Sequence, residues 1–260
     1  PTAAIPVATA LPAPSQTAHV PASCDDPGVA AALAGGSDAE VIAAFGGVQA
    51  FRTAVVTGAP CVSLADPARV WVVVDKQRPL APIDFAPGGL VAPEGVQRVE
   101  DVLLRPDAAA ALAELVAAAA SDGAGTIGLN SAYRSYASQQ STYRGYVRQL
   151  GREAADRQSA RPGYSEHQTG LAADVTACDP ACVALEAFGG TAQAQWVATN
   201  GWRFGYIVRY DEGRTAVTGY DAEPWHLRYL GTELAAAYHD GDFHTLEEFF
   251  GLPAAPDYAE

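Results

Sequence analysis

The sequence predicts an α+β fold, in which a largely antiparallel sheet is flanked by helices. Candidate strands and helices are interspersed along the 260 residues without the regular βαβ rhythm of a parallel sheet. Apolar residues make up 49% and charged residues 18% of the chain, a composition that excludes wholesale disorder. The length allows one large domain, or a main domain with a small companion.

The first 69 residues divide into two parts by composition. Residues 1–23 hold five prolines among Ala, Thr and Ser without a hydrophobic period, which is typical of a linker or tail. Residues 24–69 form a small helical region, where we expect two short helices separated by Gly46 and Gly47.

Residues 70–260 are expected to form the main domain. The β-branched run Val70–Val74 predicts a buried strand, and a proline- and glycine-rich loop follows it over 79–93. Further strands are expected at 126–130, 171–176, 206–210 and 225–230, and helices at 106–122, 138–150 and 192–199.

The net charge of the chain limits the classes of partner that it is expected to bind. Sixteen basic and thirty acidic residues give a formal net charge of −14, so the mean field repels phosphate backbones and anionic lipid surfaces. We therefore expect no nucleic-acid partner. The longest apolar stretch, 108–120, is broken by Glu114 and is too short to span a bilayer, so we expect no membrane span.

Four cysteines suggest an oxidising, extracytoplasmic location. The even count fits two disulfides, Cys24–Cys61 and Cys178–Cys182, and predicts a protein that is secreted or tethered to the cell surface. The alternative for the closely spaced second pair is a metal site. Such a site needs two further nearby ligands, and the first pair is not closely spaced.

Two short motifs contain the residues of a catalytic metal site. His167 and Asp174 are separated by a turn through Gly170, and Glu223 precedes His226 by three residues. Two imidazoles and one carboxylate are sufficient ligands for catalytic zinc, and a second carboxylate could accept a proton from water. Each motif alone also fits an ordinary surface hydrogen bond.

The same motifs, with their surroundings, identify a family resemblance. Residues 131–139 (Ser-Ala-Tyr-Arg-Ser-Tyr and Gln139), 162–174 and 223–229 closely resemble the VanY-type D-alanyl-D-alanine carboxypeptidases. These are zinc peptidases that share the hedgehog/DD-peptidase fold. The resemblance runs from about Val72 to Leu252 and preserves the order and approximate spacing of the motifs.

The resemblance implies roles for individual residues. It makes His167, Asp174 and His226 the ligands of one Zn2+ and Glu223 the catalytic base. It also implies that Arg134 approaches the scissile group, where it could stabilise the oxyanion or bind the terminal carboxylate of the substrate.

Further substrate contacts are weaker expectations, each with an ordinary structural alternative. Ser165 matches a position beside the metal, but it could be a turn hydroxyl. Gln139 could be a solvated helix residue, and Trp225 could belong to the core. Tyr133 is similarly ambiguous. Glu166, next to a ligand, could orient that ligand, although an exposed carboxylate is the more common case.

The predicted function is removal of the C-terminal D-alanine from peptidoglycan stem peptides by a metal-activated water. L,D-carboxypeptidase or endopeptidase activity on the same scaffold are alternatives. A non-catalytic zinc-containing wall-binding module is a third, although a structural zinc site needs no base such as Glu223. Residues 25–62 could be a separate targeting module or a structural brace, and the sequence leaves the oligomeric state open.

Overall fold

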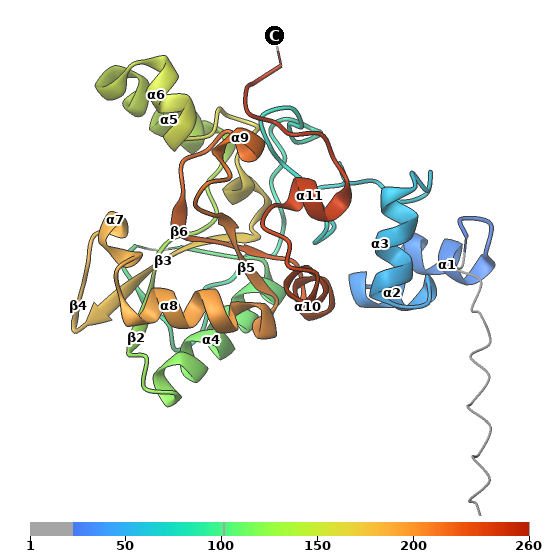
Figure 1. The fold of residues 1–260 in the computed structure, drawn as a ribbon, viewed down its shortest axis with the longest axis horizontal. Coiled ribbons are helices and arrows are strands. Elements are labelled where there is room, and N and C mark those ends of the chain that lie inside the picture. The colour runs from blue at the N-terminus through green and yellow to red at the C-terminus, as the bar shows by residue number, and fades with distance from the viewer. Residues whose placement is uncertain (1–22, 101, 260) are drawn as a thin grey trace, which may run out of the picture.

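The computed structural model describes residues 23–100 and 102–259, so all but one residue of the predicted linker lies outside the described part. The fold is of the predicted α+β class, with one open sheet and helices around it (Figure 1). The strand order is β1-β2-β3-β6-β5, and a short strand, β4, pairs with β3. The strands are β1 (Gln97–Arg98), β2 (Thr126–Ser131), β3 (Ala172–Asp179), β4 (Ala181–Cys182), β5 (Tyr206–Tyr210) and β6 (Glu223–Tyr229).

The sheet is largely antiparallel, as predicted. Only β1 runs parallel to its neighbour β2, and the remaining pairs of described strands are antiparallel. The central strand β3 is buried from Ala172 to Cys178. Its continuous apolar character follows from this position, because helices or loops cover both of its faces.

Helices cover the sheet on two sides, and Figure 1 shows α4 and α8 together along one of them. Helix α4 begins with Pro106, contacts β2, and buries Leu112 and Leu115. The helices of this domain are α4 (Pro106–Ser121), α5 (Tyr136–Leu150), α6 (Arg152–Gln158), α7 (Leu185–Phe188), α8 (Ala192–Asn200), α9 (Thr215–Thr218), α10 (Thr232–Asp240) and α11 (Leu246–Phe250), with short 3₁₀ helices η1 (Glu166–Thr169) and η2 (Gly201–Phe204).

The predicted strand at Val70–Val74 is wrong. These residues are buried, with 1–4% of their surface exposed, but they form turns and irregular backbone. Their carbonyl groups find a different partner, because the Arg228 side chain donates hydrogen bonds to Val70 O (2.9 Å) and Val72 O (2.8 Å). A continuous apolar run signals burial, and periodicity alone does not separate a buried strand from a buried loop.

The N-terminal region contains three helices where two were expected: α1 (Pro27–Gly35), α2 (Asp38–Ala44) and α3 (Val48–Val56). Asp26 caps α1, and a proline in its first turn suits that position. Helix α3 contacts α10 and α11, and the ring of its Phe51 lies 4.9 Å from that of Trp71. The region thus shares its core with the rest of the protein.

Both expected disulfides, Cys24–Cys61 and Cys178–Cys182, are present. The second closes the turn between β3 and β4. In the described residues, no single helix is long and apolar enough to cross a membrane. The bent pair α2 and α3 meets the length and composition criteria together.

Candidate active site

The two predicted motifs meet on the sheet. His167 lies in η1, Asp174 in β3 and His226 in β6, and all three are buried. Their side chains form a group in which one ligand atom of each lies within 4.8 Å of the others. Gly170, with a φ of 72°, ends η1 in the left-handed conformation and turns the chain from His167 into β3.

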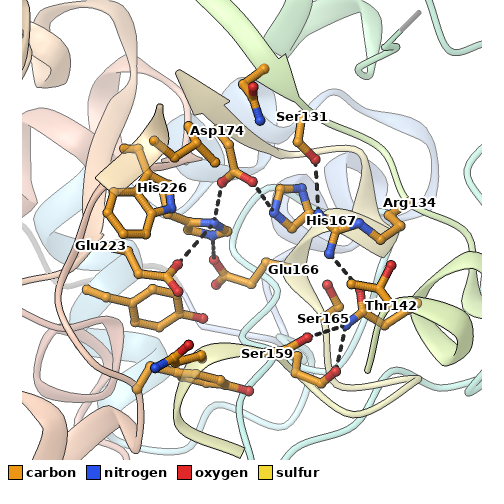
Figure 2. Close-up of a pocket in the computed structure, with 18 of the residues that line it drawn as sticks. Ser131, Arg134, Thr142, Ser159, Ser165, Glu166, His167, Asp174, Glu223 and His226 are labelled. Carbon is orange, nitrogen blue, oxygen red and sulfur yellow. Dashed lines mark hydrogen bonds and ion pairs between the residues drawn. The ribbon is translucent and has the colours of Figure 1, made fainter. Parts of the chain in front are cut away.

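Pairing of β3 with β6 places Asp174 directly opposite His226. Asp174 Oδ1 lies 2.9 Å from His226 Nδ1, and its Oδ2 lies 3.2 Å from His167 Nε2 (Figure 2). One carboxylate therefore connects the two imidazoles.

An irregularity in β6 brings Glu223 to the same group. Residues three apart in a regular strand point to opposite faces of the sheet. Between the pairs Val208–Leu227 and Tyr210–Glu223, however, β6 advances by four residues while β5 advances by two. Glu223 Oε2 consequently lies 3.8 Å from His226 Nδ1, on the same side as the ligand group.

The ring nitrogens are arranged as metal coordination requires. His167 Nδ1 lies 2.6 Å from Ala132 O and His226 Nε2 lies 3.2 Å from Glu166 Oε2. Each imidazole can donate from one of these nitrogens and keep the other free toward the group. Two imidazoles, one carboxylate and oriented outer partners fit a zinc ion.

The electrostatics of the group favour a bound cation. Burial by itself would lower the pKa of His226, but Asp174 and Glu166 outweigh it and raise that pKa to about 10. Burial raises the pKa of Glu223 to about 8. Without a cation, the carboxylates attract protons to the site. A divalent cation would replace that positive charge and favour the ionised form of Glu223.

Glu166 is not an exposed carboxylate, which was the more common case expected from the sequence. It is completely buried, and Arg209 and Arg228 donate to it at 2.9 and 3.0 Å. Burial would raise the pKa of Glu166, but the two guanidinium groups outweigh it and hold that pKa far below its usual range.

Gln139, expected as a substrate contact, is not the solvated helix residue that was its alternative, since only 1% of this residue is exposed. Its Oε1 accepts a 2.9 Å hydrogen bond from Arg134 Nη1, and Arg134 Nη2 donates to Ser131 Oγ at 3.0 Å. Gln139 and Ser131 therefore fix the guanidinium group of Arg134 at the edge of the cavity.

A cavity of about 570 Å³ opens over the ligand group. Ser165 and Trp225 line it as expected, whereas Tyr133 is not among its lining residues. Sequence reasoning missed Tyr146, Tyr210 and Tyr220, which also line the cavity. No short motif marks them, because each comes from a different segment of the chain and only the fold brings them together.

Comparisons with known proteins agree with this arrangement. Residues 101–232 match the VanY family, described as D-alanyl-D-alanine carboxypeptidase. The putative carboxypeptidase YodJ of Bacillus subtilis is 36% identical over 192 residues, which cover 72% of this chain and 69% of YodJ.

Two solved structures share the fold. The LD-carboxypeptidase LdcB has a TM-score of 0.65 at 37% identity, covering 72% of this chain and 87% of LdcB. A mutant of the vancomycin resistance D,D-pentapeptidase VanY, from a VanB-type resistance cassette and in complex with Zn(II), has a TM-score of 0.57 at 29% identity. That match covers 68% of this chain and 96% of the VanY chain.

The fold and the site define a carboxypeptidase, a hydrolase. The chain belongs to the VanY family of D-alanyl-D-alanine carboxypeptidases.

Proposed function

We propose that this protein is a zinc-dependent carboxypeptidase that acts outside the cytoplasm and removes the C-terminal D-alanine from peptidoglycan stem peptides. The observation that carries the proposal is the convergence of His167, Asp174, His226 and Glu223 at one cavity. Two disulfides support the extracytoplasmic location, where the protein would be secreted or tethered to the cell surface or wall.

His167, Asp174 and His226 would hold the metal. A bound zinc ion would lower the pKa of a water molecule in the cavity and polarise the scissile carbonyl. Glu223 accepts the proton of the attacking water and passes it to the leaving amine. Because Glu223 lies beside the ligand group and not within it, it is free to exchange this proton.

Arg134 supports a preference for a free C-terminus. It is the one arginine or lysine among the cavity-lining residues in the described part of the chain. A carboxylate that enters the cavity beside the proposed metal group would therefore pair with Arg134, which Gln139 and Ser131 already hold in place. This favours carboxypeptidase over endopeptidase activity.

A second candidate is an L,D-carboxypeptidase, which would cleave a stem tetrapeptide after an L-centre. The similarity to LdcB, at 37% identity, favours this candidate. Both candidates use the same metal, base and carboxylate contact. They differ in the configuration, D or L, of the substrate residue that precedes the scissile bond.

The test is release of D-alanine from an acyl-L-Lys-D-Ala-D-Ala peptide and from the matching peptide ending in L-Lys-D-Ala. Wild type, Glu223→Ala and chelator-treated protein are compared on both. Release from the first substrate, abolished by both treatments, is the expected result. Release from the second alone would assign the L,D activity. No release from either, with zinc bound, would contradict the proposal.

A further inference from the structure

A second group of buried charges lies behind the candidate metal ligands. It consists of two carboxylates and two guanidinium groups, all at most 2% exposed, and we call it the buried ion cluster: Glu166, Glu247, Arg209 and Arg228. Arg209 pairs with Glu247 through two hydrogen bonds of 2.8 and 3.0 Å and donates a third to Glu166. The proposed reaction assigns the cluster no role.

The two oxygens of Glu166 have different partners. Oε1 accepts from Arg209 Nε at 2.9 Å and from Arg228 Nη1 at 3.0 Å. Oε2 lies 3.2 Å from His226 Nε2. The arginines thus fix the carboxylate through one oxygen and leave the other directed at the imidazole.

The contact between Glu166 and His226 selects one form of the imidazole. A carboxylate accepts hydrogen bonds, so Nε2 must carry a proton, and the lone pair of a neutral ring then resides on Nδ1. His226 Nδ1 is the nitrogen that faces the ligand group, at 2.9 Å from Asp174 Oδ1.

Arg228 is itself held firmly. Besides Glu166, its guanidinium group donates to the carbonyl oxygens of Val70, Val72 and Tyr229, at 2.9, 2.8 and 3.1 Å. The irregular segment that replaces the expected strand therefore supplies two of the acceptors that fix this arginine. Arg228 also lies two residues after His226 on β6. The same strand therefore carries the imidazole and one of the two arginines that hold Glu166.

We propose that Glu166 is a positioning residue for His226: held by Arg209 and Arg228, it fixes the ring orientation and tautomer that present Nδ1 to a metal ion. This inference rests on the proposed zinc site. Outer hydrogen-bond partners of this kind commonly change metal affinity by about 10- to 100-fold.

The first test compares zinc affinity in wild type, Glu166→Gln and Glu247→Gln, by competition with a chromophoric chelator. The amide introduced by Glu166→Gln would offer one oxygen to three donors, so zinc affinity is expected to fall about 10- to 100-fold. Glu247→Gln is the matched control, because Glu247 contacts Arg209 in the same cluster but is not a partner of His226. An equal loss in both variants, or no loss in Glu166→Gln, would overturn the proposal.

A second test uses the wild-type protein and does not depend on the folding of a variant. With 15N-labelled histidine and bound 113Cd, nitrogen–cadmium coupling identifies the coordinating nitrogen of each ring. Coupling to Nδ1 of His226, with a proton on Nε2, is expected, and coupling to Nε2 would refute the positioning role. If wild type bound neither zinc nor cadmium, the proposed metal site itself would fail.

Discussion

Arg134 Nη1 donates a 2.9 Å hydrogen bond to Gln139 Oε1, and this contact joins a cavity-lining charge to a buried side chain at the start of α5. Gln139 in turn donates to Ala160 O at 2.6 Å, so the segment that follows α6 also holds the Gln139 side chain in place. The guanidinium group is therefore oriented before any substrate binds, which reduces the entropy lost on binding a carboxylate.

Gln139→Ala is expected to lower kcat/KM about 10-fold, mostly through KM, because a hydrogen bond to a charged group contributes about 1.5 kcal/mol or more. Steady-state kinetics on a D-alanine-terminated peptide would measure the effect. The neighbouring Gln140→Ala serves as the control and should behave like wild type. A fall in kcat alone would contradict a role in orienting Arg134 for substrate binding.

Removal of metal is expected to lower the melting temperature. A ligand that binds only the folded state stabilises it by about 2.7 kcal/mol at 100 times its Kd. Calorimetry with and without chelator would measure the shift, and added zinc should restore it. Asp174→Asn lacks one ligand charge, so its melting temperature should respond much less to zinc. An equal response would place the zinc elsewhere.

Asp156 is expected to stabilise the protein at neutral pH but not in acid. Burial alone would raise its pKa, but hydrogen bonds from Arg161 and Tyr143 outweigh it and lower that pKa. A carboxyl whose folded pKa is lowered contributes stability above its unfolded pKa of about 3.9, and loses it as pH falls through the folded value.

The free energy of unfolding of Asp156→Asn should therefore be about 1–3 kcal/mol below that of wild type at pH 7. The difference should shrink when urea unfolding is repeated at pH 3. The exposed Asp25 provides the control, since Asp25→Asn should have little effect at either pH. A difference that persists unchanged in acid would contradict the linkage.

Gly128 and Gly145 should respond to alanine in opposite directions. A Cβ at Gly128 would lie 2.6 Å from Cys178 Sγ, whereas one at Gly145, within α5, would meet an arginine side chain at 3.9 Å. Gly128→Ala is expected to destabilise by about 1–3 kcal/mol through overpacking. Gly145→Ala should stabilise by about 0.5–1 kcal/mol. Chemical denaturation of both variants checks the two signs.

The N-terminal helices are expected to unfold together with the sheet domain. Phe51 is fully buried between Phe45 and Trp71, so Phe51→Ala should cost about 3–5 kcal/mol. Fluorescence and circular dichroism should report one coincident transition in wild type and variant alike. Two separate transitions would instead support the alternative that residues 25–62 form an independent module.

The fold class and the grouping of the ligand motifs could be predicted from the sequence. The positions of the residues around those motifs could not. His167 and Asp174 are linked by a short turn, so local spacing brings them together. The positions of His226 and Glu223, in contrast, depend on the pairing of β6 with β3 and β5. Glu166 could not be placed from local spacing, because its burial depends on Arg209 and Arg228, 43 and 62 residues further along the chain.

The strand predicted at Val70–Val74 failed for a related reason. Its apolar side chains require burial, but whether its carbonyl groups join a sheet depends on a distant partner. Here that partner is the side chain of Arg228 and not a neighbouring strand. The favoured disulfide pairing is confirmed, whereas the sequence left the connectivity open, with a metal site as the alternative for Cys178 and Cys182.

The extra residues in β6 between Leu227 and Glu223 allow the positions of Glu223 and His226 to be set by different neighbouring strands. The ladder pair Asp174–His226 is set by β3, whereas the position of Glu223 is set by its pairing with Tyr210 on β5. Changes in the length or shape of residues 224–225 would therefore shift the proton acceptor while leaving the ligand pair in register. The irregular strand therefore lets the distance between the proposed proton acceptor and the proposed metal ligands change independently of the pairing between β3 and β6.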